Sequence, residues 1–240
     1  MSRRKGRRSS APSRKRYYLA GAAAVAAVAI LAYALASGQL AGRGAGSPEP
    51  VILYDDQGNG VVNASNFGGL LSTATSHGFN TIFFQVYRSG TLLFSNASLG
   101  QFVASAHAQG LEIFFALYFT NSTQTIPSSI FSDGEDGVSL DMSTLSIGAQ
   151  TTLFDYLSSN YHGKTAITTT DPTLPLAPDM LVVETYAPGD QQYIRHGMVA
   201  GVEVAATSGD QDYQQQVQYA LRHSDGVMVF DYHGLVKAGY

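Results

Sequence analysis

Cysteine and tryptophan are both absent from this chain of 240 residues. Without cysteine, the protein has no disulfide framework, no thiol chemistry and no zinc site that needs thiolate ligands. Basic residues are also scarce after position 50, because from Val51 onward five Lys and Arg stand against 17 Asp and Glu, a net charge of −12. A domain this acidic repels phosphate backbones, so we expect no nucleic-acid partner.

The basic residues that remain are concentrated at the N-terminus. Eight of the 14 Lys and Arg lie in the first sixteen residues, and an uncharged, Ala-rich stretch follows from Tyr17 to Ala36. About 20 apolar residues are enough to cross a bilayer as a helix. The pattern predicts a cytoplasmic segment (1–16), a single-pass membrane anchor (17–36) and an extracellular C-terminal domain. The alternative is a signal peptide cut after Ala34-Leu35-Ala36, which gives a secreted protein.

A Gly/Ser/Pro-rich stretch at 37–50 indicates a flexible linker, and residues 51–240 form one domain of eight short apolar runs. The runs are 51–56, 81–86, 112–119, 137–142, 164–170, 180–186, 199–205 and 226–232. Strands that alternate with helical patterns are typical of a parallel sheet, and eight of them predict a compact α/β (β/α)8 TIM-type barrel. Two connections, 121–136 and 171–178, are Pro-containing, so we expect some crossover helices to be short or missing. An open doubly wound sheet is the alternative.

Several of these runs follow a His-Gly or Gln-Gly pair. A left-handed glycine commonly ends a helix, and a basic residue in the last helical turn suits the helix dipole. We therefore expect His77-Gly78, Gln109-Gly110, His162-Gly163, His196-Gly197 and Arg222-His223 to end helices at the N-terminal face of the barrel. This removes most histidines from the catalytic candidates.

Carboxylates occur where the apolar runs end, and in a (β/α)8 barrel the active site lies at the C-terminal ends of the strands. The acidic residues in that register are Asp55, Asp56, Asp141, Glu184, Glu203 and Asp231. The other polar candidates are Gln85, Arg88, Tyr186, Tyr232 and His233. We expect Arg88 to reach this rim as a counter-charge for the carboxylates.

Two facing carboxyl groups are what glycosidic bond cleavage needs, because one protonates the leaving oxygen while the other attacks the anomeric carbon or activates water. A metal-dependent hydrolase that uses Asp55, Asp141 and Asp231 is a competing interpretation. No close ligand motif is present in the sequence, so we predict neither a metal nor another cofactor.

The stretch GFNTIFFQVYRSGTLLF (78–94) resembles the second-strand region of glycoside-hydrolase-like barrel families. FVASAHAQGLEIFFAL (102–117), GVSLDM (137–142) and SDGVMVFDYHGL (224–235) are similar to other strands of those families. The resemblance implies Asp141 as nucleophile, Glu184 as acid/base and Glu203 as an alternative acid/base. It also implies that Asp231 and Arg88 contact sugar hydroxyls or orient carboxylates.

The leading hypothesis is therefore a membrane-anchored, outward-facing barrel that cleaves glycosidic bonds of a carbohydrate. We predict substrate contacts from Arg88, Gln85, Asp55, Tyr186, Asp231, Tyr232 and His233. The alternative is a non-catalytic barrel that binds a glycan or an envelope protein through the same face, which the absence of Trp and the short length favour.

Overall fold

The structure is a computed structural model that describes residues 49–60, 62–63, 66–132, 134–187, 189–204 and 210–239. The predicted cytoplasmic segment, the predicted membrane anchor and nearly all of the predicted linker lie outside these residues. Within the described ranges, no helix combines the length and the apolar character that crossing a membrane requires.

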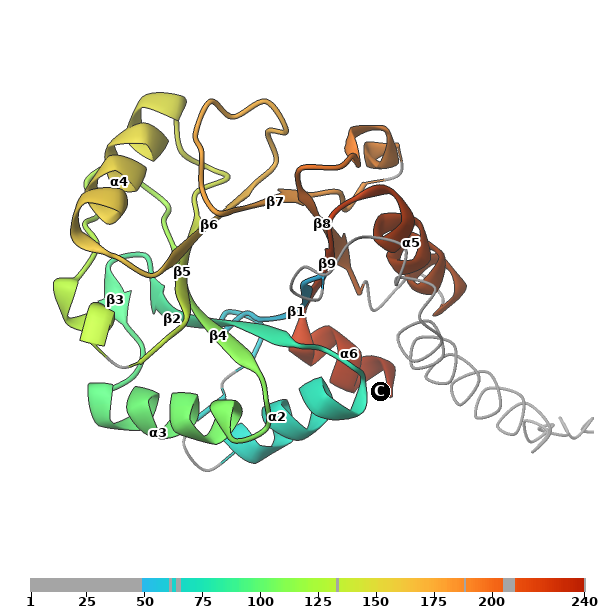
Figure 1. Cartoon of the computed structure of the whole chain (residues 1–240), viewed down its shortest axis with the longest axis horizontal. Helices are drawn as coiled ribbons and strands as arrows, with labels where there is room; N and C mark the ends of the chain where they lie inside the picture. Colours follow the sequence, from blue (N-terminus) through green and yellow to red (C-terminus); the bar gives the residue numbers. More distant parts are fainter. Residues whose placement is uncertain are drawn as a thin grey trace, which may run out of the picture. The chain divides into compact units, whose positions relative to one another are not determined.

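Eight parallel strands form a closed ring, seen end-on in Figure 1. They are β1 (Val51–Asp55), β2 (Thr81–Arg88), β4 (Glu112–Tyr118), β5 (Gly137–Asp141), β6 (Lys164–Thr169), β7 (Met180–Glu184), β8 (Val199–Glu203) and β9 (Val227–Phe230). Strand β1 pairs with both β2 and β9, which closes the ring, and the two-residue β3 (Thr91–Leu92) extends β2 antiparallel. The predicted TIM-type barrel is therefore confirmed, and the open doubly wound sheet is wrong.

Within the described residues, five α-helices lie outside the ring of strands (Figure 1). They are α2 (Phe67–Ser76), α3 (Asn96–His107), α4 (Ile147–Asn160), α5 (Asp210–His223) and α6 (Tyr232–Ala238). Aromatic rings join α2 and α3 to β2, because the ring of Phe102 lies 4.3 Å from that of Phe84 and 4.8 Å from that of Phe67. These contacts bury the outer face of the barrel wall.

Some crossovers are short, as the Pro-containing connections predicted. The β4–β5 connection carries the 3-10 turn η1 (Ser128–Ser132), and residues 170–179 between β6 and β7 contain no helix. The β7–β8 connection carries another 3-10 turn, η2 (Asp190–Tyr193). The barrel therefore closes within a domain shorter than is typical of this fold.

Three of the predicted helix ends are correct, since Gly78 and Gly110 follow α2 and α3 with φ of 76° each and α5 ends at His223. Two others are wrong. Helix α4 ends at the extended Tyr161, and Gly163 is not left-handed; its missing side chain instead leaves room for the Tyr161 ring. Gly197 is left-handed, but it lies in a turn after η2 rather than at the end of a full helix.

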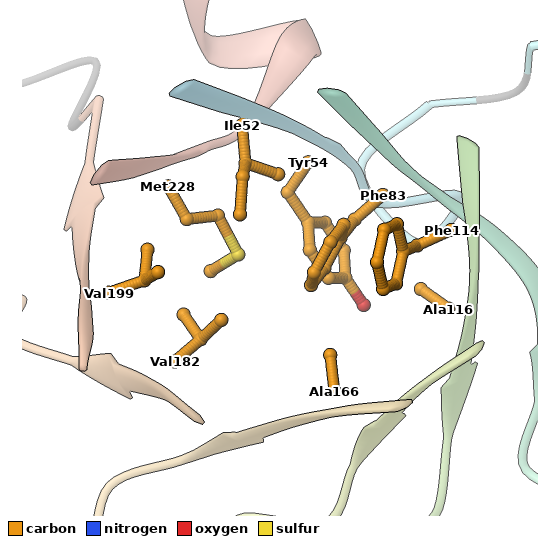
Figure 2. Packing of buried hydrophobic residues seen from close by; sticks show 9 residues of the cluster. All are labelled: Ile52, Tyr54, Phe83, Phe114, Ala116, Ala166, Val182, Val199 and Met228. Carbon is orange, nitrogen blue, oxygen red and sulfur yellow. The ribbon is translucent and has the colours of Figure 1, made fainter. Parts of the chain in front are cut away.

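Alternate strand residues fill the barrel interior (Figure 2). The cluster consists of Ile52, Tyr54, Phe83, Phe114, Ala116, Ala166, Val182, Val199 and Met228. Large and small residues face each other, and the ring of Phe114 fits because Gly137, its partner on β5, has no side chain. Because successive strand residues point to opposite faces, these positions fix which later residues of each strand also face inward.

Candidate active site

Asp141, Glu184 and Glu203 are the last residues of β5, β7 and β8. Glu184 follows the interior residue Val182 by two positions, and Glu203 follows the interior residue Val199 by four, so both stand on the inner side of the wall. The charge of Glu184 acts on Asp141, and the charge of Glu203 acts on Glu184. The fold thus brings the three predicted catalytic residues together at the C-terminal end of the barrel.

Asp141 is a buried carboxyl group, with 7% of its surface exposed. Its Oδ2 accepts a hydrogen bond from the Tyr54 hydroxyl at 3.4 Å, and its Oδ1 accepts one from the Ser143 hydroxyl at 3.5 Å. Burial, together with the charge of Glu184, raises the pKa of Asp141 from 3.8 to about 7. Near neutral pH this carboxyl can therefore both hold and release a proton, as a general acid or base must.

Glu184 is only partly buried, and its Oε1 accepts a hydrogen bond from the Tyr186 hydroxyl at 3.4 Å. Burial, followed by the charge of Glu203, raises the pKa of Glu184. Burial and the charge of Glu184 also raise the pKa of Tyr186 well above its usual value, so this hydroxyl stays protonated and remains a donor. A buried carboxyl beside a more accessible one can divide acid and base roles between them.

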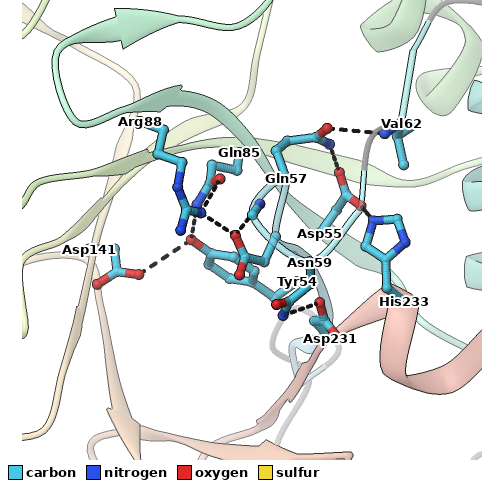
Figure 3. Close-up of polar contacts among 12 residues, drawn as sticks. Tyr54, Asp55, Gln57, Asn59, Val62, Gln85, Arg88, Asp141, Asp231 and His233 are labelled. Carbon is cyan, nitrogen blue, oxygen red and sulfur yellow. Dashed lines mark hydrogen bonds and ion pairs between the residues drawn. The ribbon is translucent and has the colours of Figure 1, made fainter. Parts of the chain in front are cut away.

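A chain of hydrogen bonds joins Asp141 to the rim of the barrel (Figure 3). Gln85 donates from Nε2 to the Tyr54 hydroxyl at 3.4 Å and accepts at Oε1 from Arg88 Nη1 at 3.1 Å. Arg88 Nη1 also forms an ion pair with Asp56 Oδ1 at 2.6 Å. Arg88 therefore reaches the rim, as expected, but its direct counter-charge is Asp56, and Gln85 and Tyr54 connect it to Asp141.

Asp55 and His233 belong to a separate polar group, where β1 meets α6 (Figure 3). Asp55 follows the inward Tyr54, so it faces the outer side of the wall. Its Oδ1 lies 3.4 Å from His233 Nε2, and its Oδ2 accepts a hydrogen bond from Gln57. Burial raises the pKa of Asp55 although the bond to His233 opposes this, and the bond to Asp55 raises the pKa of His233.

This outer group fastens the loop that follows β1. Gln57 Oε1 accepts from the Val62 backbone N–H at 3.0 Å, and Asn59 Nδ2 donates to Asp231 Oδ2 at 2.9 Å. Gly60 lies so close to the His233 ring that a side chain at residue 60 would collide with it. The loop is thus tied to β9 and α6 by side chains.

The predicted substrate-contact residues therefore separate into two places. Gln85 and Arg88 join the chain that leads to Asp141, and Tyr186 contacts Glu184. Asp55, Asp231 and His233 hold the β1 loop. Tyr232, at the start of α6, reaches α2, where its hydroxyl bonds with the Thr73 side chain.

Sequence reasoning missed Tyr54, Gln57 and Asn59. Tyr54 lies in the first apolar run, two residues after Ile52. Because alternate strand residues point to the same face, this spacing could have predicted that the Tyr54 side chain lies inside the barrel with Ile52. Gln57 and Asn59 lie in a loop whose partners are distant in the sequence, such as Asp231. No local pattern could have identified them.

A metal-dependent hydrolase needs several ligands around one ion. Within the part of the chain that the structure describes, no three His, Asp or Glu side chains stand close enough together to hold one.

A cavity of about 690 Å³ opens at the other end of the barrel, at the N-terminal ends of the strands. Lys164 Nζ and Glu112 Oε1 pair there at 2.7 Å, and Asp179 accepts from the Thr165 backbone N–H at 2.8 Å. Asp141 and Glu184, whose pKa values are raised, lie at the opposite, C-terminal end of the barrel, so we place the candidate chemistry there.

No protein-family model and no curated protein matches the sequence. Solved structures do match. A mutant O-GlcNAc hydrolase from Thermobaculum terrenum aligns over 76% of this chain and 54% of its own, with a TM-score of 0.50. A noncanonic maltogenic alpha-amylase, AmyB from Thermotoga neapolitana, aligns over 77% and 67%, with a TM-score of 0.50. CpGH84B aligns over 80% and 47%, with a TM-score of 0.51.

Each of these three proteins is 9% identical in sequence to this chain, so the likeness shows the fold alone. The chain spans about half the length of the first and third neighbours. The neighbours are glycoside hydrolases, and this chain shares their closed barrel of eight parallel strands. The fold of this chain is therefore a (β/α)8 TIM barrel, as in these three solved structures.

Proposed function

We propose that the barrel cleaves glycosidic bonds of a carbohydrate with Asp141 and Glu184 as its pair of carboxyl groups. The observation that carries the proposal is the buried Asp141, whose pKa of about 7 depends in part on the charge of Glu184. Two interacting carboxyls at the C-terminal end of a glycoside-hydrolase-like barrel supply one proton donor and one ionised partner. Glu203, exposed beside Glu184, raises the pKa of Glu184 through its charge.

The more deeply buried member of the pair suits the acid role. Burial keeps a proton on Asp141 near neutral pH, so Asp141 protonates the leaving oxygen and the more accessible Glu184 acts ionised, as nucleophile or as base for water. The sequence resemblance implies the same two residues with these roles exchanged. Three of the predicted substrate-contact residues have hydrogen bonds that lead to Asp141 or Glu184, namely Tyr186, Gln85 and Arg88. We propose that these three side chains bind sugar hydroxyls.

Hydrolysis of a panel of glycans by the full-length chain tests the proposal. Removal of a general acid or base typically costs about 100-fold to 10,000-fold in rate. We expect losses of this size in Asp141→Asn and Glu184→Gln, and no loss in Asp155→Asn, which changes an exposed carboxyl on α4. If both site variants hydrolyse a responsive glycan at the wild-type rate, the proposal is wrong.

Aryl glycosides separate the two role assignments, because a good leaving group needs no proton. If Asp141 is the acid, Asp141→Asn keeps most of its turnover of such a substrate while Glu184→Gln does not. The reverse result assigns the acid role to Glu184. Tight binding of a glycan that the wild-type protein never cleaves would instead support the alternative, a non-catalytic glycan-binding barrel.

For its location, we propose a single-pass anchor at 17–36 with the barrel outside the cell. Protease treatment of intact cells tests this, because an outward-facing barrel is digested while the basic N-terminus is protected. A mature N-terminus at residue 37 would instead indicate cleavage of a signal peptide and secretion.

A further inference from the structure

Arg88 fixes the orientation of the Gln85 amide. A guanidinium group has donors and no acceptor, so the Gln85 atom that faces it at 3.1 Å must be the carbonyl Oε1. The amide Nε2 of Gln85, a donor, therefore faces the Tyr54 hydroxyl at 3.4 Å. Asp56 keeps the guanidinium in place through the 2.6 Å ion pair.

The amide of Gln85 in turn fixes the direction of the Tyr54 proton. Tyr54 is 1% exposed, and burial together with the charge of Asp141 raises its pKa well above the usual value, so its hydroxyl keeps its proton. The hydroxyl oxygen accepts from Gln85 Nε2, which leaves the single proton free to donate to Asp141 Oδ2 at 3.4 Å. Each hydrogen bond in this chain therefore has a fixed donor and a fixed acceptor, and Arg88 determines which group donates.

We propose that Tyr54 is a positioning residue for Asp141, and that the Asp56–Arg88 ion pair holds the Tyr54 proton toward Asp141 through Gln85. Without the ion pair, the Gln85 amide is free to turn its carbonyl toward Tyr54 and draw the proton away from Asp141. An ion pair on the rim thereby acts on a buried carboxyl without touching it. The inference deepens the proposed function, on which the catalytic meaning of Asp141 rests.

The chain has a chemical consequence for Asp141. Oδ2 of Asp141 accepts a hydrogen bond from the Tyr54 hydroxyl. When Asp141 is protonated, its own proton therefore lies on the other oxygen, Oδ1, beside the Ser143 hydroxyl. The Tyr54 bond also lowers the pKa of Asp141, against burial and the charges of Glu184 and Asp56, which raise it. Loss of that bond therefore moves the titration of Asp141 to higher pH.

Titration of the Asp141 carboxyl in the full-length chain tests the inference, by carbon NMR of aspartate labelled at the carboxyl carbon. Asp141→Asn assigns the signal. Tyr54→Phe removes the donor and is expected to raise the titration midpoint by about half to one pH unit, the value of one hydrogen bond. Asp56→Asn combined with Arg88→Met removes the ion pair at constant net charge. We expect a smaller upward shift, because the lost charge of Asp56 itself raises the pKa of Asp141.

The triple variant decides between the hydrogen-bond chain and a direct electrostatic effect. The charge of Asp56 in the ion pair also acts on Asp141 directly, and this direct effect is the same with and without the Tyr54 hydroxyl. If the ion pair acts through Tyr54, its removal therefore raises the midpoint less in the Tyr54→Phe background than in the wild-type background. The inference is overturned if removing the ion pair shifts the Asp141 midpoint by the same amount in both backgrounds. If Tyr54→Phe fails to fold, Gln85→Leu takes its place in this comparison, because it removes the amide that links the ion pair to Tyr54.

The NMR readout needs no turnover, so failure of this inference and failure of the proposed function can be told apart. If the expected NMR shifts occur but no glycan is hydrolysed, the proposed function is wrong and the hydrogen-bond chain is supported. If a glycan is hydrolysed but the shifts do not occur, the function is supported and the role of the hydrogen-bond chain is wrong. In an active protein, the limb of the pH–rate profile that Asp141 controls moves to higher pH by the NMR shift, whereas a structural defect lowers the rate equally at every pH.

Discussion

Replacing Asp141 by Asn is expected to stabilise the folded protein at pH 8 and to change its stability little near pH 4. In the folded protein the pKa of Asp141 is about 7, against 3.8 for the same group in an unfolded chain. Between these values the folded state binds more protons than the unfolded state, so stability falls as the pH rises. Asn resembles the protonated carboxyl and removes this penalty.

The size of the effect follows from the difference in pKa. About three pH units at about 1.4 kcal/mol each give about 4 kcal/mol as an upper limit. The Asn amide carries one more N–H than the protonated carboxyl, and this donor needs a partner in the buried site, so we expect about 2 to 4 kcal/mol at pH 8. For a domain of this size, each kcal/mol shifts the melting temperature by about 2 to 4 °C. The Oδ1 of Asn can still accept the Tyr54 proton, so the packing of the site is kept.

Calorimetric melting of the full-length wild-type and Asp141→Asn chains at pH 4, 6 and 8 measures this. The gain in melting temperature should grow with pH, while Asp155→Asn, at an exposed position of α4, should show no such trend. An equal change at pH 4 and pH 8, or a loss of stability at pH 8, would refute the claim that Asp141 is a strained buried carboxyl.

Two further predictions concern the barrel wall and the outer polar group. Gly137→Ala places a methyl group against the Phe114 ring and should lower the free energy of unfolding in urea by about 1 to 3 kcal/mol. Gly100→Ala lies on α3, where a methyl group meets no other atoms, and should be neutral or stabilising. An equal effect of the two variants would contradict the packing argument. His233→Gln removes a group whose pKa is raised by Asp55, so its stabilising charge is present below pH 6.5 and lost as the pH rises through the folded value. The variant should therefore lose more stability at pH 6 than at pH 9, and equal losses in urea unfolding at both would count against the pairing.

The apolar runs of the sequence determined where the eight strands lie, because strands buried on both faces are nearly continuously apolar. Each of the eight predicted runs overlaps one barrel strand; seven strands are shorter than their runs, and β2 extends two residues beyond its run. The resemblance to glycoside-hydrolase-like barrels agrees with the folds of the structural neighbours. The position of Asp141 and Glu184 at strand ends also followed from the sequence alone, because the ends of parallel strands meet at one rim.

Only the tertiary structure decided which residues on that rim face each other. Asp55 is one residue from Tyr54, yet the alternation of the strand sends it to the outer side of the wall, where it meets His233. Arg88 found its counter-charge in Asp56, 32 residues earlier, once β1 and β2 were paired. The pKa of Asp141 likewise depends on burial and on Glu184, both of which exist only after the ring has closed. Charge partners and desolvation are properties of the closed barrel, whereas strand positions are local properties of the chain.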